Sequence, residues 1–235
     1  MPIQGGTINA VAGQSTQNFS PPCPWCPLFD TPSSSGSKAL VRAGNVFGRG
    51  SIQSVNRNGA KTSWQIVAAH GTHAPNTPSN YGFNSFEFWG PVIDQALVFG
   101  GGSAVNASDM GPYIRGIYSQ SDTLRRLVAS TMLVPGGTGK FVFDWGGTNS
   151  PILAKNGFVI FGAQDANNKQ GLYLVRQTGG AVRKIIAVGD SIGAGFTVGG
   201  LNVGRGGFDG KTLVFTVGYT NFQGVGLYST KVVPP

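Results

Sequence analysis

The chain has few charged residues. Only 11% of its 235 residues are Asp, Glu, Lys or Arg, against about 25% in an average soluble domain. It also lacks blocks of the helix formers Ala, Glu, Lys and Leu, whereas glycine is abundant at 38 residues. Few charges, many glycines and no helical blocks are typical of short strands joined by tight turns. The composition therefore predicts an all-β fold.

Long apolar runs are also missing. None approaches the roughly 20 residues that a membrane-spanning helix needs, so we expect no membrane span. The first residues, MPIQGGTINAVAG, have neither the basic region nor the apolar region of a signal peptide. The protein is therefore either not exported by this route or has lost its signal.

Acidic residues are scarce. Nine Asp and Glu stand against seventeen Lys and Arg, which gives a formal net charge of +8. An excess of positive charge favours anionic partners such as acidic glycans or other polyanions, although it also serves solubility. The basic residues are scattered, and no run of them marks a specific nucleic-acid site.

The sequence offers no set of residues for catalysis. Acid–base chemistry needs paired carboxylates or a carboxylate near a histidine, whereas Asp144 and Asp190 stand alone near strand ends, where they are expected to cap turns. The esterase-like Gly189-Asp190-Ser191 has no histidine downstream of it. The glycine-rich stretch 204–207 lacks the helix that a phosphate-binding loop needs. We therefore expect no enzymatic activity.

Internal repeats are the strongest positive feature. Gly-x-Tyr occurs at intervals of 55 residues, and so does a phenylalanine that opens an alternating segment. The glycine is expected to allow a turn or a close backbone approach, and the tyrosine to pack between units. The copies are Gly116-Ile117-Tyr118, Gly171-Leu172-Tyr173 and Gly226-Leu227-Tyr228, with Phe86, Phe141 and Phe196; further strands are expected at 96–101, 158–163 and 212–217, and at 124–130 and 182–190.

The N-terminal third follows the same pattern less cleanly. Its strands are expected to begin at Phe19 and to occupy 38–44, 50–55 and 63–69, with Ser-Ile-Gln in place of the tyrosine motif. The last unit lacks a fourth strand. The strand-like TINAVAG at 7–13 is similar to IIAVGD at 185–190 and is expected to complete it, because an open edge is an aggregation hazard.

Together these features predict a single domain with a small four-bladed β-propeller fold of about 55 residues per unit. The units span roughly 14–69, 83–130, 138–190 and 194–233, with 7–13 as the closing strand. A β-sandwich or an open stack of repeats is the alternative architecture.

Units with the pattern GIY…L…VPGGTG-F…NG-V-F-A…GLY resemble the propeller-like repeats of bacterial secreted or surface-anchored repeat proteins. The residues that carry the resemblance are 116–118, 134–141, 156–163 and 171–173, and the similarity covers about 85–230. The resemblance implies an extracellular or cell-surface location and a non-enzymatic role. It carries no catalytic residues over to this chain.

The two cysteines and two histidines form the pairs Cys23-x-x-Cys26 and His70-x-x-His73. This composition could supply a structural Cys₂His₂ zinc site, which leaves no open position for catalysis. A Cys23–Cys26 disulfide in an oxidising compartment, or two free thiols beside surface histidines, are the alternatives. No other cofactor is expected.

Three tryptophans follow the first phenylalanine of successive units, at Trp25, Trp89 and Trp145. Exposed on one face, their rings could stack on sugars; packing between units is the alternative. The leading hypothesis is a self-associating structural building block of an extracellular or surface layer, filament or particle. The second is a lectin-like module that binds carbohydrate or a polyanion.

Overall fold

The computed structural model describes residues 30–35, 38–44, 50–58, 61–75, 82–83, 86, 92–103, 110–116, 123–143, 151–193, 195–220 and 224–233. These described residues form sixteen strands and no α-helix, which confirms the prediction of an all-β fold. Within them, no helix has the length and apolar character needed to cross a bilayer.

The described strands form four antiparallel sheets of four strands each, in which neighbours in the chain pair with one another. The first sheet contains β1 (Asp30–Ser35), β2 (Lys38–Gly44), β3 (Gly50–Asn58) and β4 (Lys61–Ala69). The second contains β5 (Val92–Ile93), β6 (Ala96–Gly101), β7 (Gly111–Gly116) and β8 (Arg125–Arg126). The third contains β9 (Ile152–Lys155), β10 (Phe158–Gln164), β11 (Gln170–Arg176) and β12 (Arg183–Ala187). The fourth contains β13 (Ser191–Ile192), β14 (Phe196–Asn202), β15 (Thr212–Tyr219) and β16 (Val225–Lys231).

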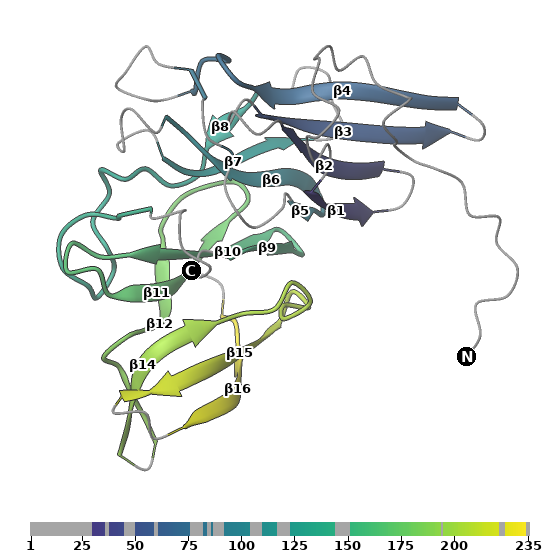
Figure 1. The fold of residues 1–235 in the computed structure, drawn as a ribbon. Helices are drawn as coiled ribbons and strands as arrows, with labels where there is room; N and C mark the ends of the chain where they lie inside the picture. The colour runs from purple at the N-terminus through teal and green to yellow at the C-terminus, as the bar shows by residue number, and fades with distance from the viewer. Residues whose placement is uncertain are drawn as a thin grey trace, which may run out of the picture.

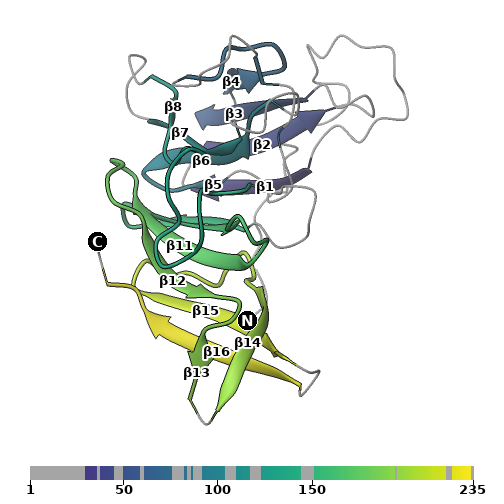
Figure 2. The same cartoon turned by 90° about the vertical axis from the view of Figure 1, so that its left-hand side faces the viewer.

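The four sheets follow one another through the molecule in chain order (Figure 1). The first sheet lies at one end and the fourth at the other, and a view turned by 90° shows the same succession (Figure 2). The described residues therefore form an open succession of sheets. The closing strand expected at 7–13 lies outside the described residues.

The expected second strands agree with the structure, because segments 38–44 and 96–101 coincide with β2 and β6. The expected first strand at Phe141 is wrong, because β9 takes that place. Of the strand expected to begin at Phe86, only Phe86 itself lies within the described residues. Val142 forms only a single bridge with Gln164. Phe141 and Phe143 alternate with an exposed valine because both rings pack into the core from a loop. That burial gives the same sequence pattern as a paired strand.

The Gly-x-Tyr motif has a structural counterpart in the second sheet, but at Gly111-Pro112-Tyr113 rather than at Gly116. Gly116 is the last residue of β7, and residues 117–118 lie outside the described part of the chain. Tyr113 instead pairs with Phe99 across β6 and β7, as Tyr173 pairs with Phe161. The true spacing between these two copies is therefore longer than 55 residues.

Each such tyrosine stacks on a phenylalanine of the preceding strand. The ring centroids lie 5.9 Å apart in the second sheet, 5.6 Å in the third and 6.1 Å in the fourth. The motif's glycine lets the tyrosine ring lie over the backbone, since a Cβ on Gly171 would come within 2.5 Å of the Tyr173 hydroxyl. The expected close approach is thus confirmed. The three pairs are Phe99–Tyr113, Phe161–Tyr173 and Phe215–Tyr228.

The hydrophobic core is divided among the junctions between sheets. We call the face that carries the phenylalanine–tyrosine pair the aromatic face of a sheet, and its opposite the aliphatic face. The aromatic face of each later sheet packs on the aliphatic face of the sheet before it. Ile52 of the first sheet contacts the cluster of Phe99 and Tyr113, Val98 and Ile114 of the second join Phe161 and Tyr173, and Ile160 and Leu172 of the third join Phe215 and Val217. The tyrosines therefore pack between units, as expected.

Candidate functional site

The aliphatic face of the fourth sheet has no sheet packed on it among the described residues. Val98 and Ile160, which precede the paired phenylalanines of the second and third sheets, are both 0% exposed. Their counterpart Val214 is 39% exposed. Leu172 is 2% exposed in the third sheet, whereas Leu227 at the same motif position is 74% exposed. Beside it, Val225 is 75% exposed.

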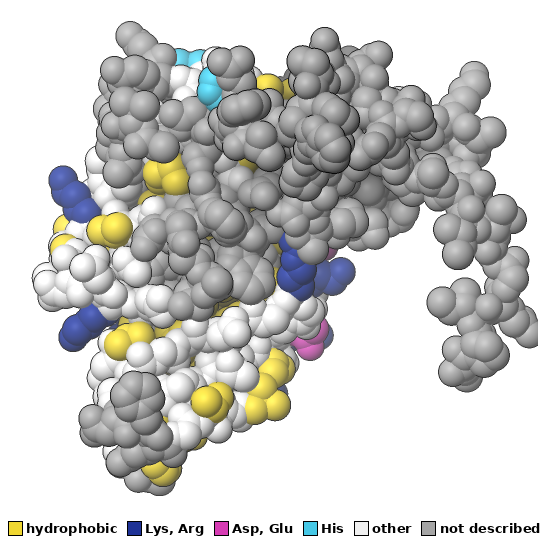
Figure 3. Space-filling model, viewed as in Figure 1, with side chains coloured by type: hydrophobic (Ala, Val, Ile, Leu, Met, Phe, Trp, Pro, Cys, Tyr) yellow, Lys and Arg dark blue, Asp and Glu magenta, His cyan; other side chains and the backbone are white. Residues whose placement is uncertain are grey.

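The same sheet also has an open edge. In the first three sheets the third strand is flanked by a fourth, which is β4, β8 or β12. Among the described strands β16 pairs with β15 alone. Hydrophobic side chains are visible on the surface over this sheet, at the lower end of the molecule (Figure 3). An open edge beside an uncovered apolar face is a surface suited to a further strand or sheet. We call the two together the terminal surface, made of the β16 edge with Val214, Val225 and Leu227.

Arginines of the fourth strands join the second sheet to the third and the third sheet to the fourth. The guanidinium of Arg125 in β8 donates a hydrogen bond to the carbonyl oxygen of Gln177, just after β11. Arg183 holds the same place in β12 and donates to the carbonyl oxygen of Val233, after β16, over 3.2 Å. Ile114–Arg125 and Leu174–Arg183 are equivalent register pairs, which shows that the contact repeats.

A shallow hollow lies between β12 and the end of β16. Three basic residues line it, Arg183, Lys184 and Lys231, together with Thr230 and the apolar Leu174 and Val232. Three cations around one hollow attract an anion. No motif marks these residues in the sequence, where the only signal is the adjacent Arg183 and Lys184 in VRKII at 182–186.

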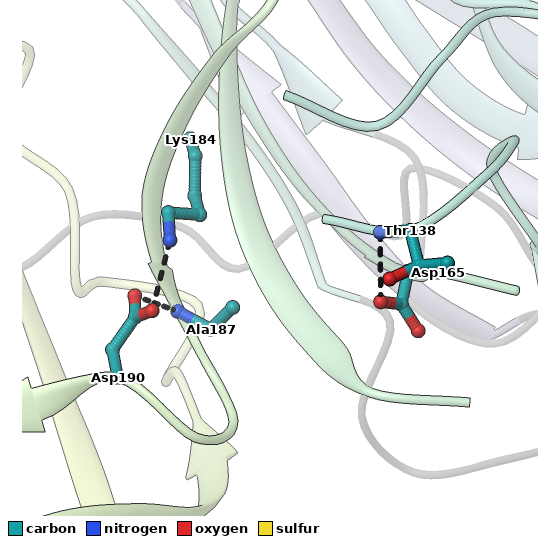
Figure 4. A network of polar contacts seen from close by, with 5 residues as sticks. All are labelled: Thr138, Asp165, Lys184, Ala187 and Asp190. Atoms are coloured by element: carbon teal, nitrogen blue, oxygen red, sulfur yellow. Dashed lines mark hydrogen bonds and ion pairs between the residues drawn. The ribbon is translucent and has the colours of Figure 1, made fainter. Parts of the chain in front are cut away.

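One carboxylate partly offsets this charge. Asp190 accepts a hydrogen bond from the Lys184 ammonium over 2.8 Å and another from the amide of Ala187 over 2.9 Å (Figure 4). The second bond closes the turn between β12 and β13. The expectation that Asp190 caps a turn is therefore confirmed.

A second carboxylate organises the turn between β10 and β11. Asp165 is buried and accepts hydrogen bonds from the amides of Thr138, Asn167 and Lys169 over 2.8–3.1 Å. Its contact with Thr138 ties the loop before β9 to this turn (Figure 4). Burial by itself raises the pKa of Asp165, but the three amide hydrogen bonds and the nearby Lys169 charge outweigh it, and the pKa lies below its usual value.

The remaining described acidic side chains also serve the fold. Asp209 accepts hydrogen bonds from the amides of Lys211 and Thr212, which lower its pKa. Asp94 in the second sheet accepts a hydrogen bond from the Gln177 side chain over 3.3 Å and pairs with Lys155. Where the structure describes an acidic side chain, it therefore closes a turn or joins two sheets.

The predicted histidine pair lies on the turn after β4. Both His70 and His73 are exposed, and His73 forms a single bridge with Gly82. They lie at the upper end of the molecule (Figure 3), after the last strand of the first sheet, whereas Ser191 begins β13 of the fourth sheet. In the described part of the chain, no three His, Cys, Asp or Glu side chains gather as a metal site. Cys23 and Cys26 lie outside that part, so the zinc site and its alternatives stay predictions.

The predicted ring-stacking residues Trp25, Trp89 and Trp145 all lie outside the described residues. Asp144 does too. Among the described residues, the candidate sites are instead the terminal surface and the basic hollow. The signal for the terminal surface was present in the sequence as the apolar Val225 and Leu227, which flank the glycine of the last Gly-x-Tyr copy.

In comparisons with known proteins, no family model, no curated protein and no solved structure matches the chain. Its function must therefore be inferred from its own residues.

Proposed function

We propose that the protein is a non-enzymatic structural building block that self-associates through the end of its fourth sheet. The observation that supports this proposal is the terminal surface. At Val214 and Leu227 it keeps the apolar residues that fill the core at the equivalent positions of the third sheet, yet leaves them exposed. Large apolar side chains that cluster on a surface mark an interaction site.

The use of carboxylates supports a role without catalysis. The described side chains of Asp94, Asp165, Asp190 and Asp209 all accept hydrogen bonds within the fold. Low charge and three cores shared between sheets suit a rigid component of an extracellular or surface layer, filament or particle.

A closed four-bladed propeller, with 7–13 as the closing strand of its own chain, is the finer expectation for the fold and the alternative to strand addition between copies. A ring requires the first sheet to meet the fourth, whereas the described sheets form an open succession. Small-angle scattering of the single chain separates the two arrangements, because a closed ring has the smaller radius of gyration.

Self-association is tested by light scattering over a range of concentrations, with electron microscopy of the same samples. We expect regular assemblies larger than one chain. The double variant Val225→Asp/Leu227→Asp should remain a single chain, because two charges cannot be buried in an apolar contact. Leu133→Asp is a matched control, since Leu133 is equally exposed but lies elsewhere. A wild-type chain that stays single at all concentrations contradicts the proposal.

The second candidate function is binding of an acidic polysaccharide or another polyanion, in a lectin-like manner. The basic hollow of Arg183, Lys184 and Lys231 favours it. Dextran sulfate serves as the probe, with neutral dextran as the control. Binding that weakens as salt rises, and that is lost in Arg183→Gln/Lys231→Gln, supports this function. Tryptophan fluorescence titrated with neutral sugars tests the predicted stacking by Trp25, Trp89 and Trp145.

A further inference from the structure

Comparison with the third sheet defines the strand that would fit beside the terminal surface. The fourth sheet ends at β16, whose outer edge corresponds to the edge of β11 that pairs with β12 in the third sheet. The pairs in the third sheet are Gly171–Ala187 and Leu172–Ile186. Gly226 and Leu227 are the counterparts of Gly171 and Leu172, so a strand similar to β12 fits beside β16 in the same register.

The chain contains one such strand sequence, at the opposite end of the polypeptide. Residues 8–13, INAVAG, share Ile, Ala and Val with residues 185–190, IIAVGD, at the same spacing. This alignment places Ala10 opposite Gly226 and Asn9 opposite Leu227. Main-chain hydrogen bonds along an open edge supply the affinity in such strand addition.

Two observations favour a second copy of the chain as the donor. First, the segment precedes the first sheet, which lies at the far end of the succession from β16 (Figure 2). Within one chain, residues 14–29 would have to bridge from β1 to β16 past the second and third sheets.

Second, the first sheet and the fourth sheet, at the two ends of the succession, both expose apolar side chains. Ile66 pairs with Gln53, which holds the tyrosine position of the first sheet, so Ile66 lies on the face equivalent to an aromatic face. It is 59% exposed. Ser51 and Gln53 on this face are already buried, so Ile66 is the apolar side chain that it offers to Val214 and Leu227 of another copy.

We propose that residues 7–13 of one copy add as the missing fourth strand to β16 of a second copy, whose exposed Val225 and Leu227 are then covered by the donor. This inference rests on the proposed self-association and gives its mechanism. Contacts of this head-to-tail kind generate closed rings or open filaments, according to the rotation between copies. Because the joined surfaces differ, each copy donates once and accepts once.

Disulfide trapping tests the pairing. Two full-length chains are prepared with Cys23→Ser and Cys26→Ser, one carrying Asn9→Cys and the other, isotope-labelled, carrying Leu227→Cys. Because each chain has a single cysteine, a mixed covalent dimer forms only between copies. We expect mild oxidation of the assembled mixture to give at least tenfold more mixed dimer than the control pair Asn9→Cys with Lys231→Cys. That control shifts the cysteine four residues, or about 13 Å, along β16.

A third chain carries both Asn9→Cys and Leu227→Cys. A cross-link within this chain, without mixed dimers in the first experiment, shows that the strand closes its own molecule and overturns the inference. Equal yields for the Leu227→Cys and Lys231→Cys mixtures also overturn it. If the wild-type chain assembles but the mixed dimer is absent, only this mechanism fails and the proposed function stands. If the chain never assembles, both fail.

Discussion

Phe161 and Tyr173 face each other across β10 and β11, with their ring centroids 5.6 Å apart and their planes inclined by 29°. Both side chains are almost fully buried against the aliphatic face of the second sheet. Stacked aromatic pairs contribute about 0.5–1.5 kcal/mol beyond their buried area. The pair therefore forms the centre of the junction between the second and third sheets.

Ionisation of Tyr173 is predicted to destabilise the fold at high pH. Burial, followed by the charges of Asp165 and Asp190, raises the pKa of Tyr173 to about 12. An unfolded tyrosine ionises near pH 10, so the folded chain holds the proton more tightly. The stability that this gives is present below about pH 10 and is lost as the pH rises from 10 to 12.

The test is the thermal unfolding midpoint of the wild type and of Tyr173→Phe between pH 8 and 12. We expect the variant to lose less stability than the wild type above pH 10, since it has no proton to release. Parallel curves for the two proteins contradict the prediction.

Low pH is predicted to destabilise the fold through protonation of Asp165. The pKa of Asp165 is lowered in the folded chain because the amide hydrogen bonds outweigh burial. The contribution of Asp165 to stability is therefore present above its unfolded pKa of about 3.9 and is lost as the pH falls through the folded pKa. Asp165→Asn should destabilise by about 1–3 kcal/mol at pH 7. Urea unfolding at pH 7 and at pH 3 should show that the difference in unfolding free energy between the wild type and Asp165→Asn becomes smaller in acid. A difference that stays the same would indicate lost packing instead.

Equivalent leucines in the third and fourth sheets should respond differently to truncation. Leu172→Ala removes a buried side chain and should cost about 2–5 kcal/mol. Leu227→Ala removes an exposed side chain and should change the stability of the single chain by less than about 0.5 kcal/mol. Urea unfolding at concentrations where the chain is single measures both. Equal losses are inconsistent with an uncovered fourth sheet.

Replacement of the junction arginines by lysine should weaken the contact between sheets. The part-buried Arg125 donates to the Gln177 carbonyl, and the shorter ammonium of Arg125→Lys cannot reproduce the planar guanidinium. We expect a loss of about 1–2 kcal/mol. Arg183→Lys serves as the comparison and should cost less, because its bond to Val233 is exposed. The denaturant midpoints of the two variants measure these losses. A larger loss for Arg183→Lys than for Arg125→Lys contradicts the prediction.

Much of the sheet structure could be predicted from local pattern. Segments 38–44, 96–101 and 158–163 alternate or concentrate apolar residues and are bounded by turns, and each is a second strand. The first strand at Phe141 was mispredicted because Phe141 and Phe143 alternate as loop residues that pack on the core. A regular period of 55 residues also drew attention to Gly116. The true motif begins earlier, at Gly111, because Tyr113 precedes Phe161 by 48 positions whereas Tyr173 precedes Phe215 by 42.

The candidate site was less accessible to sequence reasoning. A missing fourth strand could be inferred from the repeat, but the exposure of Val214 depends on which sheet packs on which face. The link from Asp94 to Gln177 joins residues 83 positions apart, so no local pattern indicates it. The repeated arginine contact required the register of β8 and β12 before Arg125 and Arg183 could be recognised as equivalent.

Because every junction joins an aliphatic face to an aromatic face, the succession of sheets has a polarity. A duplicated unit inserted into the chain would fit only in the orientation of its neighbours, and it would bring with it both surfaces that its neighbours require. The number of units could therefore change by tandem duplication without redesign of any existing junction. In this architecture, the length of the array can evolve independently of the packing within it.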